Sequence, residues 1–194
     1  NLFGATYLSD IINRNNLRGN AEINELTDIL ASSIGSLTNP LKLSNTFGSV
    51  KNVKLSVNTV INYLNYLEDA FLVEKAVRYD IKGKKYINTP AKYYFVDMGL
   101  RNARISFRQQ EYTHIMENVI YNELRMRGYN VDVGIIQVTE KDDEGKSLRK
   151  QLEVDFVCNL GSSRYYIQSA YSLPTEEKRN QEVRPFKKID DSFK

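Results

Sequence analysis

The sequence predicts an α+β protein in which a winged helix-turn-helix is followed by a second, α/β domain. Apolar residues recur at helical spacing in three segments between residues 20 and 71, and the period changes to that of strands after Leu72. Three helices followed by a hairpin is the order of elements in a winged helix. A further helix and three strand-like segments later in the chain predict the second domain.

The three helices are delimited by residues that favour helix ends. Asn20 is a good N-cap for the first helix, which Gly35 closes, and Pro40 begins a short second helix. Ser56 caps the third and most periodic helix. The apolar side of this third helix consists of Val57, Val60, Ile61, Leu64, Leu67 and Phe71.

The predicted β-hairpin after Leu72 has a basic tip, Lys82-Gly83-Lys84-Lys85. Basic residues also surround the third helix, and the whole set is Lys51, Lys54, Arg78, Lys82, Lys84, Lys85 and Lys92. In a winged helix these side chains would meet DNA phosphates. Four residues of the third helix could approach the major groove: Asn58, Thr59, Asn62 and Tyr63. No arginine lies among them, so guanine readout is not expected. The alternative is that the lysines only keep an exposed strand edge soluble, and winged helices also bind proteins.

The domain boundaries follow from changes in composition. We place a winged-helix-like domain at 20–98, a polar connector at 99–112 and the second domain at 113–194. The second domain is expected to contain, in order, a helix over about 113–127, strands over about 129–138, 150–158 and 164–171, and a polar helix from about Pro174. The charged segment 139–149 is expected to be a loop between the first two of these strands.

The composition excludes several classes of function. The 194 residues carry a net charge of only +3, so the overall charge does not demonstrate nucleic-acid binding. Cys158 is the only cysteine and His114 the only histidine, which excludes an internal disulfide, a cysteine-based zinc site and His-rich metal centres. No apolar run approaches the roughly 20 residues that cross a bilayer. We therefore expect a cytoplasmic protein without a membrane partner.

Four positions in the last third of the chain follow the pattern of a metal-dependent phosphodiesterase: Glu117, Asp155, Gln168 and Ala170. Asp155 shares a face of its strand with Glu153, and Gln168 shares a face of the next strand with Ala170. Pairing of these strands would bring Asp155 and Gln168 together, and the preceding helix could add Glu117. Magnesium prefers such oxygen ligands, so Glu117 and Asp155 are candidate ligands of one ion.

Catalysis at these positions would also need a cation. A lysine beside the metal favours hydroxide and neutralises the charge that develops on the phosphate, and Ala170 does neither. Arg164 or Lys178 could replace it, although the spacing favours neither. The alternative is that the acids form a solvated strand face. Gly145-Lys146-Ser147 is similar to the end of a P-loop, but acidic neighbours would repel a phosphate, so no nucleotide site is expected here.

Four segments taken together resemble a known family. They are Lys92-Tyr93-Tyr94-Phe95-Val96-Asp97-Met98-Gly99-Leu100-Arg101-Asn102, Glu117-Asn118-Val119-Ile120-Tyr121-Asn122-Glu123-Leu124-Arg125-Met126-Arg127-Gly128-Tyr129, and Glu153-Val154-Asp155-Phe156-Val157 with Tyr166-Ile167-Gln168-Ser169-Ala170-Tyr171-Ser172-Leu173. The resemblance is to the C-terminal half of a family of bacterial and archaeal AAA-type ATPases, and it covers nearly the whole chain. It implies a P-loop ATPase domain, a winged helix and a restriction-endonuclease-like domain similar to PD-(D/E)XK nucleases.

The resemblance also implies how this chain is organised. Residues 1–19 would be a helical connector from a missing ATPase domain, and the nuclease-like domain at 113–194 would be truncated. The nuclease-like positions carry over as Glu117, Asp155 and Gln168, with Ala170 where the family has lysine. ATP would then belong to the missing domain alone, and the chain itself would need no cofactor, apart from the magnesium ion that Glu117 and Asp155 could hold.

The leading hypothesis is a non-catalytic C-terminal module of an AAA-type ATPase that binds double-stranded DNA or a partner protein, besides its own ATPase domain. One alternative is an active Mg²⁺-dependent DNA nuclease with an altered site. The other is an adaptor that binds only proteins. Plasmid cleavage and salt-dependent DNA binding distinguish the three.

Overall fold

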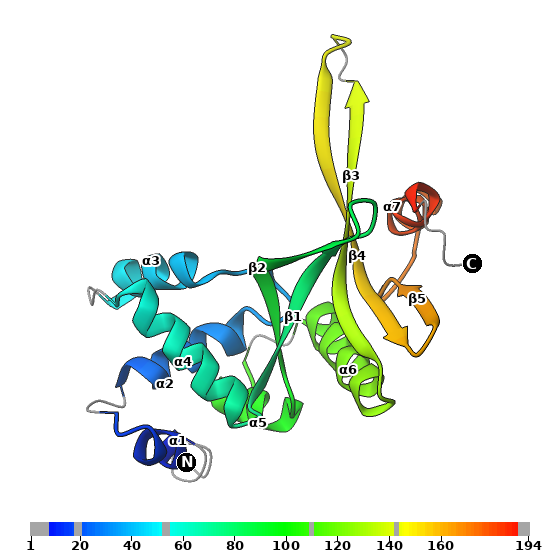
Figure 1. The fold of residues 1–194 in the computed structure, drawn as a ribbon. Coiled ribbons are helices and arrows are strands. Elements are labelled where there is room, and N and C mark those ends of the chain that lie inside the picture. Colours follow the sequence, from blue (N-terminus) through cyan, green and yellow to red (C-terminus); the bar gives the residue numbers. More distant parts are fainter. Residues whose placement is uncertain (1–7, 18–20, 52–54, 109–110, 142–143, 190–194) are drawn as a thin grey trace. The chain divides into compact units, whose positions relative to one another are not determined.

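The computed structural model describes residues 8–17, 21–51, 55–108, 111–141 and 144–189. This part of the chain is α+β, with seven α-helices and one mixed five-stranded sheet of order β2-β1-β3-β4-β5 (Figure 1). The chain forms two compact units, and each is discontinuous in sequence. The first comprises residues 1–75 and 92–118, and the second comprises residues 76–91 and 119–194.

The first unit is built from helices. They are α1 (Ser9–Arg14), α2 (Ala21–Ser32), α3 (Pro40–Lys51), α4 (Val57–Asp69) and α5 (Met98–Arg104), with the first half of α6 (Tyr112–Met126). The predicted apolar stripe of α2 is buried, and α3 begins at Pro40 as expected. Asn20, the predicted cap of α2, lies outside the described residues. Each of α2, α3 and α4 contributes buried leucines to the core of this unit, for example Leu26, Leu43 and Leu64.

Helix α4 begins where the sequence predicts. The hydroxyl of Ser56 accepts a hydrogen bond from the backbone N–H of Thr59 at 3.0 Å, which satisfies one of the donors that a helix start leaves open. Val60, Leu64 and Leu67 are buried, so one side of α4 faces the core and the opposite side faces solvent. Phe71, which was assigned to the apolar side, follows the helix and is 75% exposed.

The range predicted as a polar connector includes α5, whose arginines are bonded to α2. Arg101 is 2% exposed and its Nε donates to the carbonyl oxygen of Ala31 at 2.7 Å. Arg104 Nε and Nη2 donate to the two carboxylate oxygens of Asp28 at 2.6 and 3.1 Å. Two bonds between a guanidinium and a carboxylate fix the relative orientation of the groups. These arginines thus hold α5 against α2.

The predicted hairpin forms from β1 (Val73–Asp80) and β2 (Lys85–Phe95). Its residues 76–91 belong to the second unit, where β1 pairs in parallel with β3 (Asn130–Lys141) and Arg78 lies opposite Val133. Strand β3 pairs antiparallel with β4 (Ser147–Leu160), and β4 pairs antiparallel with β5 (Ser163–Ile167). The hairpin that the sequence assigns wholly to the first domain therefore also supplies two strands to the five-stranded sheet.

Apolar side chains cover both faces of this sheet. On one face the rings of Tyr121 in α6 and Phe156 in β4 lie 6.4 Å apart. On the other, a buried cluster that includes Tyr79 and Val157 is covered by Phe186 of the short 3-10 helix η2 (Phe186–Lys188).

The carboxylate of Asp80 at the end of β1 accepts a hydrogen bond from Gly83 N–H at 3.0 Å, which fixes the hairpin turn.

Strand β4 has a bulge at Asp155. Asp132 lies opposite Val157 and Gly134 lies opposite Val154, so β4 has one residue more than β3 in this interval. A bulge changes the direction in which side chains point and bends the strand. Gly134 is tightly enclosed here, because a Cβ added to it would lie 2.8 Å from Val157 Cγ2 and 2.9 Å from Val154 Cβ. The bulge is what positions the Asp155 carboxylate.

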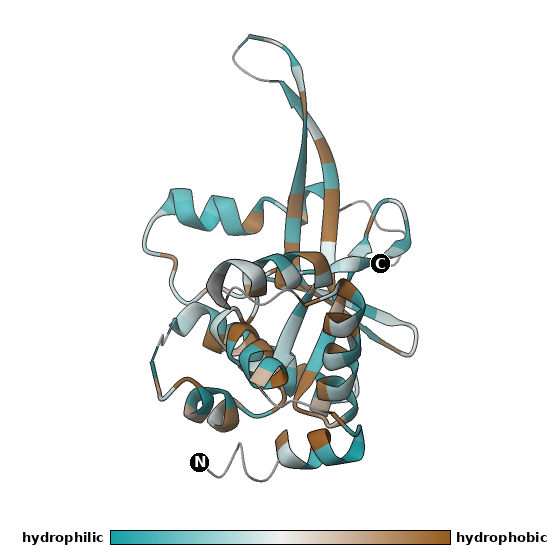
Figure 2. Ribbon diagram, turned by 90° about the vertical axis from the view of Figure 1, so that its left-hand side faces the viewer, coloured by the Kyte–Doolittle hydropathy of each residue, from teal (hydrophilic) through white to brown (hydrophobic). Residues whose placement is uncertain are grey.

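The segment 139–149, predicted as a charged loop, is mostly strand. Strands β3 and β4 remain paired as far as Lys141 opposite Ser147, so the prediction of a loop is wrong for this part. Beyond the pairings with β1 and β5, the two strands form a ribbon that is hydrophilic toward its turn (Figure 2). Exposed strands that pair only with each other need no apolar side chains, and this explains why the apolar pattern did not indicate them.

The last predicted strand is shorter than expected. Strand β5 ends at Ile167, so Gln168 and Ala170 follow the strand and do not share a face of it. The polar helix expected after Pro174 is α7 (Glu176–Val183), whose N-cap is the hydroxyl of Thr175. None of the helices in the described part of the chain is both long and apolar enough to span a membrane.

Candidate nucleic-acid interface and the nuclease-like positions

The solvent side of α4 carries a stripe of uncharged polar side chains. Asn58, Asn62 and Asn65 are exposed and stand four and three residues apart, which places them on one face of the helix. Ile61, 39% exposed, lies between them. No described residue forms a hydrogen bond with the three side-chain amides, so their donors and acceptors are open to solvent. We call these four residues the α4 stripe.

Two of the four predicted groove residues are elsewhere on the helix. The hydroxyl of Thr59 lies 2.8 Å from the hydroxyl of Ser56, within the N-cap of α4. Tyr63 is half-buried. The pKa of its phenol is raised mainly by burial and, to a smaller extent, by the negative charge of Glu22. Tyr63 therefore lies at the border between the exposed and the buried side of α4. Asn65 was not among the predicted groove residues, although its spacing from Asn58 and Asn62 indicates the same face of the helix.

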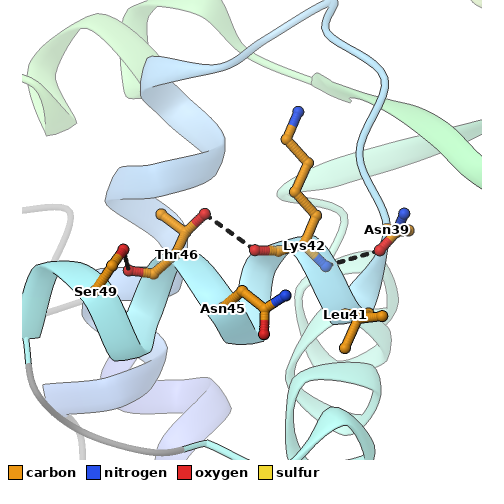
Figure 3. Close-up of a pocket in the computed structure, with 6 residues that line it drawn as sticks. All are labelled: Asn39, Leu41, Lys42, Asn45, Thr46 and Ser49. Atoms are coloured by element: carbon orange, nitrogen blue, oxygen red, sulfur yellow. Dashed lines mark hydrogen bonds between the residues drawn. The ribbon is translucent and has the colours of Figure 1, made fainter.

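A polar hollow lies on the exposed face of α3. It is lined by Asn39, Leu41, Lys42, Asn45, Thr46 and Ser49 (Figure 3). Several of these groups bond to the helix itself: Asn39 Oδ1 accepts from Lys42 N–H at 2.7 Å, and the Thr46 hydroxyl donates to the Lys42 carbonyl at 3.0 Å. Lys42 is its only charged residue. The surface offers hydroxyl, amide and ammonium groups, which are the groups that contact phosphates in protein–DNA complexes.

The predicted phosphate-binding lysines have different surroundings. Lys82, Lys84 and Lys85 are exposed at the hairpin tip, in the second unit. Lys54 and the side chain of Lys51, the last residue of α3, lie outside the described part of the structure.

The two other predicted members of the basic set are not exposed cations. Lys92 is only 4% exposed, and its ammonium lies 2.8 Å from Glu117 Oε1, so its inclusion among surface cations is wrong. Arg78 is partly buried, and its guanidinium donates to the carbonyl oxygens of Thr89 and Pro90 at 3.1 and 3.0 Å. Its Nε and Nη2 thus bond to the backbone of the neighbouring strand β2.

Glu117 belongs to a buried cluster in the first unit. Its Oε1 accepts hydrogen bonds from Lys92 Nζ at 2.8 Å and from the Tyr94 hydroxyl at 2.6 Å. The carboxylate also lies over Gly35, where an added Cβ would be 3.4 Å from both carboxylate oxygens. The residue is 8% exposed. A carboxylate with an ammonium and a phenol on the same oxygen is satisfied without a metal ion.

Asp155 and Gln168 lie side by side in the second unit. The backbone N–H of Asp155 donates to Gln168 Oε1 at 3.3 Å, and Asp155 Oδ2 accepts from the backbone N–H of Ser169 at 2.7 Å. Gln168 Nε2 donates to Glu182 Oε2 at 3.0 Å, and Glu182 Oε1 lies 2.5 Å from Lys178 Nζ. The side chain of Gln168 thus links the backbone of Asp155 to Glu182 of α7, and Glu182 pairs with Lys178 one helical turn earlier.

Glu182 was not among the predicted site residues, and it joins the Asp155 cluster through Gln168. Glu117 belongs to the first unit and the Asp155 cluster to the second. Ala170 supplies no charge, but Lys178 does, and the other candidate cation, Arg164, instead donates to Asn159 Oδ1 at 2.7 Å. In the described residues no three side chains of His, Cys, Asp or Glu gather as metal ligands do.

A second carboxylate of the same unit is perturbed by its surroundings. Burial raises the pKa of Asp132 to about 6, against the opposing effects of Arg125, Arg164 and a hydrogen bond with Tyr86. The guanidinium of Arg164 lies 5.0 Å from the ring centroid of Tyr79, and the Tyr79 and Tyr86 rings are 5.1 Å apart. Burial also raises the pKa of the Cys158 thiol to about 12, so this cysteine is a buried apolar group and not a nucleophile.

Comparison with known proteins gives a family for this chain. Residues 1–111, more than half of the chain, match a family described as a domain of unknown function, DUF8612. The chain belongs to that family. This match covers the helical part, including α2, α3 and α4, and the hairpin β1–β2.

Two relatives align with most of the chain. An uncharacterized protein of Haemophilus influenzae is 36% identical over 173 residues, which are 89% of this chain and 40% of the relative. An uncharacterized protein of Methanocaldococcus jannaschii is 29% identical over 182 residues, which are 94% of this chain and 38% of the relative. The chain thus spans about two-fifths of the length of these curated relatives. No solved structure matches significantly.

Proposed function

We propose that this chain is a non-catalytic C-terminal module of an AAA-type ATPase that binds duplex DNA through a winged helix. The winged helix would consist of α2, α3 and α4 with the hairpin β1–β2. The order of these elements supports the proposal. The greater length of both aligned relatives supports a longer parent protein.

The observation that carries the DNA-binding proposal is the α4 stripe. In a helix-turn-helix the second helix of the motif enters the major groove and its exposed polar residues contact base edges. Helix α4 follows α3, packs against it, and presents three amides without a partner among the described residues. All three lie along the solvent side of α4, which is the side that a recognition helix presents to the groove.

The neighbouring surface of α3 suits the phosphates. Helix α3 would be the first helix of the motif, which crosses the DNA backbone. Its hollow presents the ammonium group of Lys42 together with amide and hydroxyl groups. Such groups position a protein on DNA without reading the base sequence. The exposed lysines of the hairpin tip, Lys82, Lys84 and Lys85, are further candidates for phosphate contact.

Titration of a labelled duplex at several salt concentrations tests this proposal. We expect the logarithm of the binding constant to fall linearly with the logarithm of the salt concentration, with a slope of about −0.9 for each phosphate contact. Replacement of Lys82, Lys84 and Lys85 by Gln should reduce the slope. A triple variant at the exposed residues Lys146, Lys187 and Lys188 removes the same charge elsewhere and is the matched control. Absence of salt-dependent binding would contradict the proposal and favour an adaptor that binds only proteins.

A Mg²⁺-dependent nuclease is the second candidate function, and the Asp155 cluster favours it. Asp155 and Glu182 supply carboxylates, Gln168 lies between them, and Lys178 supplies the cation that Ala170 does not. Carboxylates with one nearby lysine are the groups that magnesium-assisted phosphodiester hydrolysis requires. The helix and sheet of the second unit are compatible with the proposed restriction-endonuclease-like fold.

Supercoiled plasmid incubated with Mg²⁺ or Mn²⁺ distinguishes the two functions. The non-catalytic proposal expects intact plasmid. Cleavage that is lost in Asp155→Asn and in Lys178→Gln would replace it by the nuclease. Asp155→Asn has an oxygen that still accepts from Ser169 N–H, so it removes the charge without removing that bond. Cleavage unchanged in both variants would indicate a contaminating enzyme.

A further inference from the structure

We propose that α4 reads adenines in the major groove of duplex DNA through Asn58, Asn62 and Asn65. This inference rests on the proposed DNA-binding function and adds the class of sequence that is recognised. Three kinds of observation carry it: the spacing of the amides, the residue types of the helix and the polarity of the helix ends.

The three amides together span about four base pairs. Asn58 and Asn65 are seven residues apart, which is about 10.5 Å along a helix axis. Bases follow one another by about 3.4 Å along a strand, so this length corresponds to about three steps. Because the stripe is on one face, the amides can meet three base pairs within this stretch while the buried face of α4 remains on the core.

The residue types select adenine among the four bases. A side-chain amide has a donor and an acceptor side by side, and it pairs with N7 and the amino group of adenine. Guanine is read by arginine or lysine, and the sequence of α4 contains neither. The methyl groups of Ile61, exposed between the amides, can contact the thymine methyl that every A·T pair presents in the same groove.

The ends of α4 indicate which end enters the groove. The N-terminal end carries the partial positive charge of the helix and is capped by the uncharged Ser56. The acidic residues Glu68 and Asp69 are at the C-terminal end, where phosphates would repel them. Asn58 and Asn62, in the first two turns, therefore reach the base edges most directly.

The same surface is a poor match for a protein partner. The strongest contacts between proteins come from buried aromatic residues and arginine. The α4 stripe consists of three asparagines and one isoleucine, without an exposed aromatic residue or any arginine. Amides along one face, with no aromatic or arginine anchor, suit a partner that presents a regular row of donors and acceptors, which is what the major groove offers.

Selection from a random duplex pool by the 194-residue chain, followed by sequencing, tests the inference. We expect the bound sequences to share a short run of A·T pairs. Replacing one of these pairs by G·C should weaken binding by about 5- to 150-fold, the range expected for a bidentate contact. Placing 7-deazaadenine at one position removes only N7, and so it tests for the major-groove contact directly.

Single substitutions assign the contacts. Each of Asn58→Ala, Asn62→Ala and Asn65→Ala should relax the preference at one base pair and leave the salt dependence of binding unchanged, since no phosphate contact is lost. In the matching variant 7-deazaadenine should have no further effect. Asn62→Arg should shift the preference at its position to guanine. Asn180→Ala, which alters an exposed asparagine of α7, should change nothing.

The possible outcomes separate the inference from the function on which it rests. Salt-dependent binding without sequence preference, or with a G·C preference, would overturn adenine readout and leave the DNA-binding proposal intact. An A·T preference that the three alanine variants do not change would also overturn it, because readout would then come from DNA shape or the minor groove. No salt-dependent binding to any duplex would overturn both.

Discussion

Replacing Glu117 by Gln should destabilise the first unit strongly, because it leaves an ammonium buried without its carboxylate. The side chains of Lys92 and Glu117 are 5% and 11% exposed, and 2.8 Å separates Lys92 Nζ from Glu117 Oε1. The amide oxygen that Glu117→Gln introduces would still accept hydrogen bonds from Lys92 and Tyr94 but would carry no charge. The substitution therefore isolates the electrostatic part of the interaction.

The expected loss is large relative to the total stability of a domain. Removing one partner of a buried ion pair typically costs about 3–5 kcal/mol, whereas the free energy of unfolding of a whole domain is about 5–15 kcal/mol. With a urea dependence of about 2 kcal/mol per molar, the midpoint of urea unfolding should fall by about 1.5–2.5 M. Tyr94→Phe removes a neutral donor from the same oxygen and should cost less, about 1–3 kcal/mol.

Urea unfolding of the variants measures this loss, and a double-mutant cycle with Lys92→Met isolates the pair. The double variant, which combines Lys92→Met with Glu117→Gln, has no buried charge at either position, so it should lose less stability than the sum of the two single variants. Repeating the unfolding with Mg²⁺ separates the structural role from the metal-binding one. A ligand that binds the folded state raises stability with its concentration, and we expect no such rise that depends on Glu117.

Two results would refute this reasoning. If Glu117→Gln left the urea midpoint unchanged, the ion pair would contribute nothing and the carboxylate would be available for another role. If Mg²⁺ stabilised the natural chain but not the variant, Glu117 would be a metal ligand, as the pattern of nuclease-like positions suggests. Additive losses in the cycle would mean that the two charges do not interact.

Two further predictions concern the second unit. Gly134→Ala should destabilise it by about 1–3 kcal/mol in chemical unfolding, because the new methyl group would overlap Val154 and Val157, and an unchanged midpoint would mean that the bulge adjusts easily. Burial raises the pKa of Asp132 from 3.8 to about 6. Between these pH values the folded state therefore binds more protons than the unfolded state. The stability that protonated Asp132 contributes is present in full below about pH 4 and falls as the pH rises to about 6. Asp132→Asn should remove this part of the pH dependence, and an identical pH profile for the variant would contradict the assignment.

Much of the helical part could be predicted from the sequence because its signals are local. Ser56 caps α4 through a bond to a backbone group three residues later, and Pro40 begins α3. Both effects depend on neighbours in the chain, as does the alternation that predicted β1 and β2. Such features require no knowledge of distant residues.

The missed features depend on residues far apart in the chain. Lys92 looked like one of several surface lysines, and only its contact with Glu117, 25 residues later, shows that it is buried. Arg101 looked like part of a polar connector, but it bonds to Ala31, 70 residues earlier. A charged side chain carries no local sign of the partner that will neutralise it, so pattern alone assigns it to the surface.

The candidate interface on α4 was partly predictable because helical periodicity is a local signal. Asn58 and Asn62 follow from helical periodicity, and the same argument applied one turn further would have given Asn65. Tyr63 stays a predicted groove residue, and it is half-buried, as an amphipathic side chain on the border of a stripe can be. Its proximity to Glu22 of α2 is a contact that periodicity does not reveal.

The Asp155 cluster explains how a chain with Ala170 can still need its other nuclease-like residues. Asp155 Oδ2 receives the Ser169 N–H, and Gln168 links the backbone of Asp155 to Glu182. These bonds tie the bulge of β4 to the segment after β5 and to α7. An aspartate and a glutamine at these positions therefore have a structural use that is independent of any reaction. Finding them in the nuclease-like pattern does not by itself imply catalysis. The weight of the nuclease hypothesis rests on Glu182 and Lys178 of α7, whose side chains bond to Gln168 and to each other.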